Sequence, residues 1–157
     1  MERKPLVLDD NGNVRQIQDG DTLNARAKEV DVFSAINEEL TTIPKFSPVY
    51  ISSSGKVKLS RANSTTTHKV IGLAPSSIAS LVSGYIQTDG QITGSTSEWD
   101  AVTGQTGGLT TGATYFLDEA NTGKIKTTAP LTGSIVVIGI ALSETSLDLN
   151  IERPILL

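Results

Sequence analysis

A repeated series of short apolar runs is the feature of this sequence that most restricts its fold. The first copy comprises residues 48–52, 55–58 and 70–74, with the sequences Pro-Val-Tyr-Ile-Ser, Gly-Lys-Val-Lys and Val-Ile-Gly-Leu-Ala. The second comprises residues 113–117, 123–126 and 137–141, with the sequences Ala-Thr-Tyr-Phe-Leu, Gly-Lys-Ile-Lys and Val-Ile-Gly-Ile-Ala. The offset is 68 residues between Gly55 and Gly123 and 67 between Gly72 and Gly139. Two copies are too few for a solenoid, so we expect two related halves that fold against each other.

Each run has the character of a β-strand. The runs are short, rich in β-branched or aromatic residues, and bounded by Gly, Pro, Asn or Thr, as strands joined by tight turns are. We therefore predict an all-β fold with minor α content, with half-repeats at about residues 45–90 and 108–157. The glycine-rich insert between them, residues 91–107, is expected to be a surface excursion.

The first 27 residues differ from the rest. Leu6-Val-Leu and Val14-Arg-Gln-Ile flank residues 9–13, whose Asn and Gly tolerate positive φ, and this pattern predicts a hairpin. A two-stranded hairpin is marginal in water, so it must pack on the main domain, a neighbouring subunit or an external partner. We expect an arm or hairpin at 1–27 and a β-domain at 28–157. The candidate partner-contacting residues are Leu6, Val7, Leu8, Val14 and Ile17.

Composition argues against several functional classes. The chain has no cysteine, which excludes disulfides, thiolate metal sites and cysteine nucleophiles. A net charge of −4 without clustered Lys and Arg argues against a nucleic-acid partner. No apolar run reaches the ~18 residues of a membrane-spanning helix, so no membrane partner is expected. Aromatic residues make up only 4%, and the thin aliphatic core that this implies favours oligomerisation about a shared hydrophobic axis.

Three segments have ambiguous local patterns. We read residues 29–36 as a strand, with a short helix over 31–40 as the alternative. Residues 75–83 place Ile78, Leu81 and Val82 at helical spacing, which predicts a helical turn. Residues 84–88 return to a strand that ends at Asp89-Gly90, a common hairpin turn.

No catalytic, cofactor-binding or metal-binding residues are predicted, and the chain is not expected to be an enzyme. His68 is the sole histidine and is expected to be an exposed loop residue, without a Ser/His/Asp arrangement around it. Residues 104–112 are glycine-rich but lack the Lys-Ser/Thr of a phosphate-binding loop, so they are read as a turn. The adjacent carboxylates at 38–39 and 118–119 are interpreted as surface charge.

Residues 9–13 show a weak likeness to a calcium-binding loop. Asp9, Asn11 and Asn13 alternate as they do at the start of an EF-hand. However, Val14 stands where glycine is needed and Gly20 stands where the bidentate Glu belongs. We therefore predict no calcium site.

Trp99, the only tryptophan, lies in the glycine-rich insert. Exposed aromatic residues in glycine-rich loops are a common recognition device, so Trp99 and Tyr85 are candidates for surface recognition of a sugar or a protein partner. The alternative is that these two residues pack in the core or on a sheet face.

Four segments together resemble structural proteins of tailed bacteriophages, notably capsid decoration (cement) proteins, head fibres and some tail-fibre segments. These segments are residues 4–13, 108–117, 123–130 and 138–151. The resemblance implies a barrel or β-tulip-like sandwich built from the two halves, with an extended N-terminal arm. It also implies a homotrimer at the threefold positions of a capsid.

The function implied by this resemblance is that of a virion structural protein that binds and stabilises the capsid, with the major capsid protein as its partner. Its place would be the capsid exterior, after assembly in the cytoplasm of the bacterial host. The alternative is a head- or tail-fibre adhesin that binds a receptor or glycan through the Trp99 loop.

Overall fold

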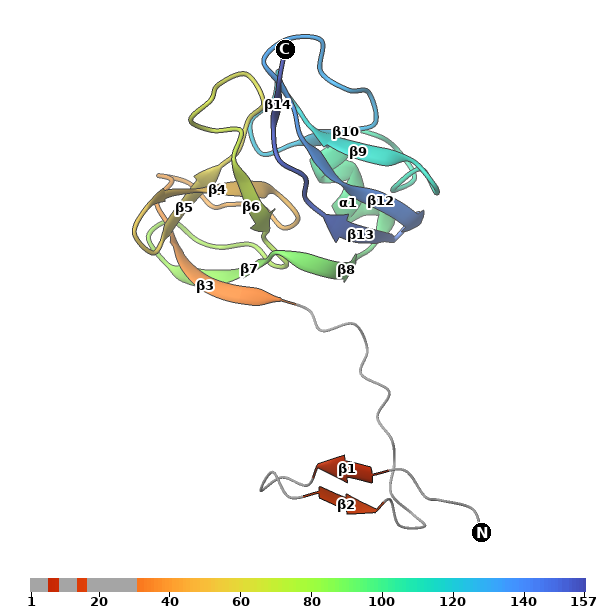
Figure 1. Cartoon of the computed structure of the whole chain (residues 1–157). Coiled ribbons are helices and arrows are strands. Elements are labelled where there is room, and N and C mark those ends of the chain that lie inside the picture. The colour runs from red at the N-terminus through yellow and green to blue at the C-terminus, as the bar shows by residue number, and fades with distance from the viewer. Residues whose placement is uncertain (1–5, 9–13, 17–30) are drawn as a thin grey trace.

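The computed structural model describes residues 6–8, 14–16 and 31–157, whose regular secondary structure is mainly β-strand (Figure 1). The one helix in these ranges is α1 (Thr96–Thr103), which confirms the predicted all-β class with minor α content. The strands before α1 are β1 (Leu6–Leu8), β2 (Val14–Gln16), β3 (Val32–Asn37), β4 (Pro48–Ser53), β5 (Lys56–Leu59), β6 (Val70–Leu73), β7 (Ser83–Gln87) and β8 (Asp89–Thr93). The strands after α1 are β9 (Thr114–Leu117), β10 (Ile125–Lys126), β11 (Ser134–Ile135), β12 (Val137–Ser143), β13 (Ser146–Asn150) and β14 (Ile155–Leu156).

The first half forms a closed barrel of five strands in the order β3-β5-β4-β6-β7. The ring closes where β3 and β5 run parallel, and there the Ile36 N–H donates to the Gly55 carbonyl at 2.9 Å. Closure removes the free edges that an open sheet would expose. The barrel interior is filled by aliphatic side chains, namely Ala35, Ile43, Val49, Val57, Ala74, Ile78 and Ile86.

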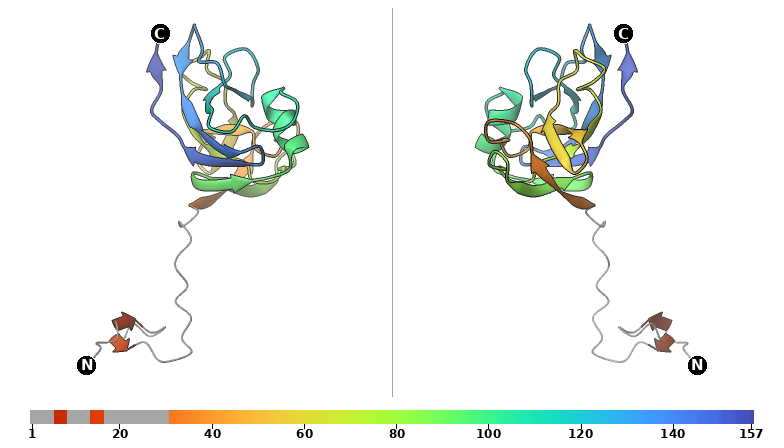
Figure 2. Two further views of the ribbon diagram at one scale, coloured as in Figure 1. Left: turned by 90° about the vertical axis from the view of Figure 1, so that its right-hand side faces the viewer. Right: turned by 90° about the vertical axis from the view of Figure 1, so that its left-hand side faces the viewer.

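The second half forms an antiparallel sheet in the order β10-β9-β12-β13-β8. Strands β11 and β14 pair separately, and Figure 2 shows β14 on the side of the body opposite α1. The larger core cluster lies mainly in this half, with Trp99, Tyr115 and Leu147 among its members. Phe46 and Leu73 join it from the first half, so this cluster contains side chains from both halves.

The strand orders of the two halves match. The order β3-β7-β6-β4-β5 corresponds to β8-β13-β12-β9-β10, and β3 and β8 both come first in the chain within their halves. Each half also carries a β-bulge in the same place. In β4 and β6, Val49 faces Gly72 and Tyr50 faces Val70, and in β9 and β12, Tyr115 faces Gly139 and Phe116 faces Val137. The backbone pairing thus makes Val49 the equivalent of Tyr115. The sequence repeat aligns Tyr50 with Tyr115, so the two alignments differ by one residue.

Gly72 and Gly139 occupy the same position beside this bulge in the two halves. A Cβ added to Gly72 would lie 2.3 Å from the Gln87 carbonyl oxygen, and one added to Gly139 would lie 2.1 Å from that of Asp148. Neither contact is sterically possible, so glycine is required for β6 and β12 to approach their neighbours this closely.

The prediction that residues 91–107 form a surface excursion is wrong. This segment contains most of β8, which pairs with β13 over five residues, and the whole of α1, whose Trp99 and Val102 are buried. Asp89-Gly90 is likewise not a hairpin turn, because both residues belong to β8 while β7 belongs to the barrel. The glycine-rich composition suggested a loop, but the segment contains a strand and a helix whose side chains belong to the larger core cluster.

The other two ambiguous segments are both non-helical. Residues 32–37 form β3, which agrees with the strand reading and excludes the helix over 31–40. The predicted helical turn at 75–83 is wrong, because Ile78 forms an antiparallel bridge with Ile43 in which each N–H donates to the other carbonyl at 2.9 Å. The backbone N–H and C=O of Ile78 therefore pair with Ile43 and not within a helical turn.

We predict that Gly72→Ala and Gly139→Ala each lower the free energy of unfolding by about 1–3 kcal/mol, because the added methyl group must displace backbone. Urea unfolding followed by circular dichroism would measure the change. Asn150→Ala, at an exposed position of β13, is the control and should change stability by less than about 0.5 kcal/mol. A glycine variant as stable as this control would contradict the prediction.

Candidate functional site

The predicted hairpin is present in the described part of the N-terminal segment. β1 and β2 pair antiparallel, with Leu6 opposite Gln16, Val7 opposite Arg15 and Leu8 opposite Val14. They form a two-stranded sheet that none of the other described strands joins. Ile17 and the turn at 9–13, with the calcium-like Asp9, Asn11 and Asn13, lie outside the described residues. Each strand therefore has one edge that no strand in the described ranges covers.

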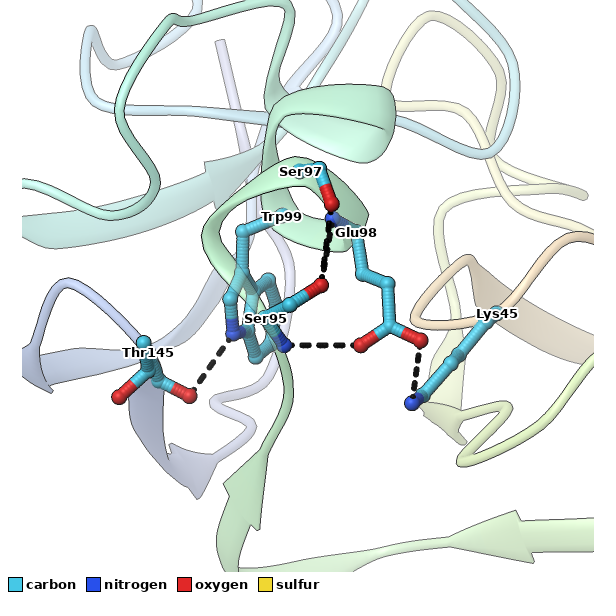
Figure 3. A network of polar contacts seen from close by, with 6 residues as sticks. All are labelled: Lys45, Ser95, Ser97, Glu98, Trp99 and Thr145. Carbon is cyan, nitrogen blue, oxygen red and sulfur yellow. Dashed lines mark hydrogen bonds and ion pairs between the residues drawn. The ribbon is translucent and has the colours of Figure 1, made fainter.

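Trp99 is fully buried, so its assignment to surface recognition is wrong and the core-packing alternative holds. Its ring stacks on Phe46, with a centroid distance of 4.0 Å and an interplanar angle of 14°. Its indole N–H donates to the Thr145 carbonyl at 3.0 Å, as Figure 3 shows. A buried tryptophan needs such a partner for its N–H, and here the partner comes from the turn between β12 and β13.

The N-terminus of α1 holds Trp99 in place. Ser95 is the N-cap of a capping box, since its Oγ accepts from the Glu98 N–H at 3.3 Å and its N–H donates to the Glu98 carboxylate at 2.8 Å (Figure 3). The other Glu98 oxygen accepts from Lys45 Nζ at 2.8 Å, and this bond lowers the pKa of Glu98. Lys45 precedes Phe46, so the ion pair and the ring stack tie the same two segments together.

The glycine-rich turn after α1 surrounds a carboxylate of this chain. Gly104 ends the helix with φ of 70°. The N–H groups of Gly107 and Gly108 donate to the two carboxylate oxygens of Asp100, at 3.2 and 2.6 Å. The backbone donors that could have bound a phosphate are therefore occupied by Asp100, in agreement with the reading of 104–112 as a turn.

The paired carboxylates are engaged within the fold, which corrects their interpretation as surface charge. Asp118 is buried and accepts from the N–H groups of Ala120 and Asn121 at 2.7 and 3.1 Å. Burial opposes ionisation of Asp118, but these bonds and the Asn121 side chain outweigh it and lower the pKa. Glu119 forms an ion pair with Lys126.

Glu38 and Glu39 are engaged in the same way in the first half. The Glu38 carboxylate accepts from Ser52 Oγ at 2.6 Å and from Lys56 Nζ at 3.2 Å. These two bonds lower its pKa, with the Ser52 bond contributing most. The Glu39 carboxylate accepts from the Leu59 N–H at 2.9 Å.

His68 is buried, which corrects the expectation of an exposed loop histidine. Its Nδ1 lies 2.6 Å from Ser134 Oγ, a contact that joins the loop before β6 to β11. Ser134 is only 1% exposed, so a substrate could not reach its hydroxyl in this conformation, and the pair acts as a cross-link between the halves. Burial, and to a lesser extent the neighbouring charge of Lys69, lowers the pKa of His68.

A pocket of about 670 Å³ lies beside this histidine. Its wall combines Tyr50, Ile51 and Leu156 with two lysines, Lys58 and Lys69. Glu38 also faces it, but its carboxylate already accepts two hydrogen bonds. The pocket therefore offers a mixed apolar and cationic surface without a free carboxylate to act as a base.

Within the described residues, no three His, Asp or Glu side chains are grouped closely enough to hold a metal ion. In the same ranges, no helix has the length and apolar character needed to cross a bilayer. Sequence reasoning missed the roles of Phe46, which stacks on Trp99, and of Ser134, which bonds to His68. No sequence signal marks Ser134, because its partner His68 is 66 residues away.

In comparisons with known proteins, the sequence matches no family model and no curated protein.

We expect Trp99→Ala to lower the free energy of unfolding by about 3–5 kcal/mol, because it removes a buried indole and leaves a cavity between the halves. Circular dichroism during urea unfolding is the appropriate measurement, since the variant lacks tryptophan fluorescence. Leu131→Ala, at a side chain that is 88% exposed, should change stability by less than about 0.5 kcal/mol. Equal effects of the two substitutions would show that Trp99 does not join the halves.

The buried His68 predicts that stability falls as the medium is acidified. Its folded pKa lies below the unfolded value of about 6.5, so the unfolded state binds the extra proton. The stability linked to neutral His68 is complete above pH of about 6.5 and is lost as the pH falls through the lower folded pKa. Between about pH 7.5 and 5, the native chain should lose more stability than His68→Gln. Parallel pH profiles for the two proteins would contradict this.

Proposed function

We propose that this chain is a structural protein of a tailed-phage virion that binds the outside of the capsid and stabilises it. The major capsid protein would be its partner, and residues 1 to about 27 would be the attaching arm. The protein would join the shell in the cytoplasm of the bacterial host. A homotrimeric form, which the resemblance implies, belongs to the same proposal.

The observation that carries the proposal is the β1–β2 hairpin. It is a separate two-stranded sheet, and such a sheet has too few strands to be stable alone in water. The uncovered edge of each strand presents N–H and C=O groups that can pair with an added strand. Strand addition provides affinity through the backbone and needs no large side-chain pocket.

The body is suited to an attached, reinforcing role. The Asp100 and Asp118 carboxylates and the glycine-rich turn are engaged in internal hydrogen bonds, as are His68 and Ser134. The side chains usually recruited for catalysis therefore serve in this body to hold turns and the seam between the halves. The alternative fibre-adhesin function depended on Trp99 at the surface, and the burial of Trp99 removes that basis.

The test is occupancy on purified capsids that lack the protein. Deletion of residues 2–20 should abolish binding while the body remains folded by circular dichroism. A sharper pair is Val7→Pro and Val7→Thr. Proline removes a backbone donor from β1 and should prevent binding, whereas threonine suits a strand and should preserve it.

Two outcomes would count against the proposal, and they differ in meaning. Full-length protein that does not bind capsids would refute the decoration function itself. Full-length and deleted proteins that bind equally well would refute only the role of the arm.

A further inference from the structure

The outward face of β3 and β7 carries no charged residue. Burial alternates along β3 and along β7 as far as Ile86, and outward residues lie opposite one another, Ser34 facing Tyr85 and Ile36 facing Ser83. We call this surface the β3–β7 face and define it by Val32, Ser34, Ile36, Ser83 and Tyr85. Tyr85 is 62% exposed and Val32 is 52% exposed. The solvent side of an antiparallel pair is normally polar, so large apolar side chains here mark a contact surface.

The turn that leads into β7 carries two more exposed apolar residues, Leu81 and Val82. Leu81 is 72% exposed and has φ of 60°, a left-handed conformation that is unfavourable for a non-glycine residue. The turn is tied to β3, since the Leu81 N–H donates to the Asn37 carbonyl at 2.9 Å and the Asn37 N–H donates to the Val82 carbonyl at 3.0 Å. A strained backbone that holds an apolar side chain in solvent indicates a function for that side chain. This observation is independent of the strand pattern.

The chemistry of the face matches a second copy of itself. Each chain carries a net charge of −4, so two copies approach most readily over an uncharged surface. The hydroxyls of Ser34 and Ser83 lie 2.7 Å apart, and each can both donate and accept. Apolar and hydroxyl groups can therefore both pair with their own kind where the same face of several copies meets at a symmetry axis. A strongly charged partner would find no counter-charge at these five positions.

We propose that the β3–β7 face, with Leu81 and Val82, is a contact surface between copies of this chain. Residues 1–30 join the body at Asp31, next to Val32, where the Asp31 carbonyl accepts from the Thr88 N–H at 2.8 Å. Figure 1 shows β3 and β7 side by side where the described body begins. Association through this face would bring the points of attachment of the N-terminal segments close together. Several arms on one assembly would then bind a repetitive surface with avidity.

The inference is tested without capsids, so its failure is separate from failure of the decoration proposal. Sedimentation equilibrium and light scattering on the full-length protein should give a mass above the 16.6 kDa of one chain. Tyr85→Glu and Val32→Glu should weaken association by on the order of tenfold or more, because each places a charge in a face that carries none. Leu131→Glu is the matched control. It adds the same negative charge at an exposed apolar residue outside the face, and it should leave the mass unchanged.

Leu81→Gly separates loss of contact from loss of folding. Glycine adopts φ of 60° without strain, so this variant should unfold at the same or a higher urea concentration than the native chain while associating more weakly. A monomeric native protein, or native-like association of Tyr85→Glu, would overturn the proposal. A loss of association in Leu131→Glu as large as that in Tyr85→Glu would also overturn it, because the effect would then be one of net charge.

Discussion

The two halves of the body depend on one aromatic contact at their seam. Phe46 is contributed by the segment before β4 and Trp99 by α1, and their stacked rings join side chains from both halves in a single core. Neither half contains many aromatic residues, and the remaining core is aliphatic. Both rings of the stack are fully buried within this cluster. The ion pair between Lys45 and Glu98 and the indole bond to Thr145 fix its orientation.

The same seam explains why two halves with one strand order differ in closure. In the first half, β5 returns to β3 and the five strands form a ring. In the second half, α1 follows β8 directly and contacts β10, so the helix stands beside the strand that would have closed the ring. The helix brings Trp99 into the space where a second barrel would have had its own interior. The second half therefore remains an open sheet, and α1 attaches it to the first half.

Several polar side chains of the body are engaged in internal hydrogen bonds. Asp100 occupies the glycine-rich turn, Asp118 caps its own turn, and His68 bonds across the halves to Ser134. In contrast, the outward residues of β3 and β7 are exposed without charge, and the β1–β2 hairpin stands as a sheet of only two strands. Both features gain free energy by covering apolar surface or pairing backbone groups with another chain.

The sequence by itself determined the strand content, the duplication and the N-terminal hairpin strands, because these depend on local pattern: alternation, turn residues and a constant offset. It matched Tyr50 to Tyr115, whereas the backbone pairing makes Val49 the equivalent of Tyr115. Only the tertiary structure could decide this one-residue difference, since register is set by hydrogen bonds and bulges between strands that are distant in sequence. The burial of Trp99 and His68 was decided in the same way. Glycine-rich or threonine-rich neighbours predict a loop, but the partners that enclose these side chains, Phe46 and Ser134, are 53 and 66 residues away and are brought near only by the folding of one half onto the other.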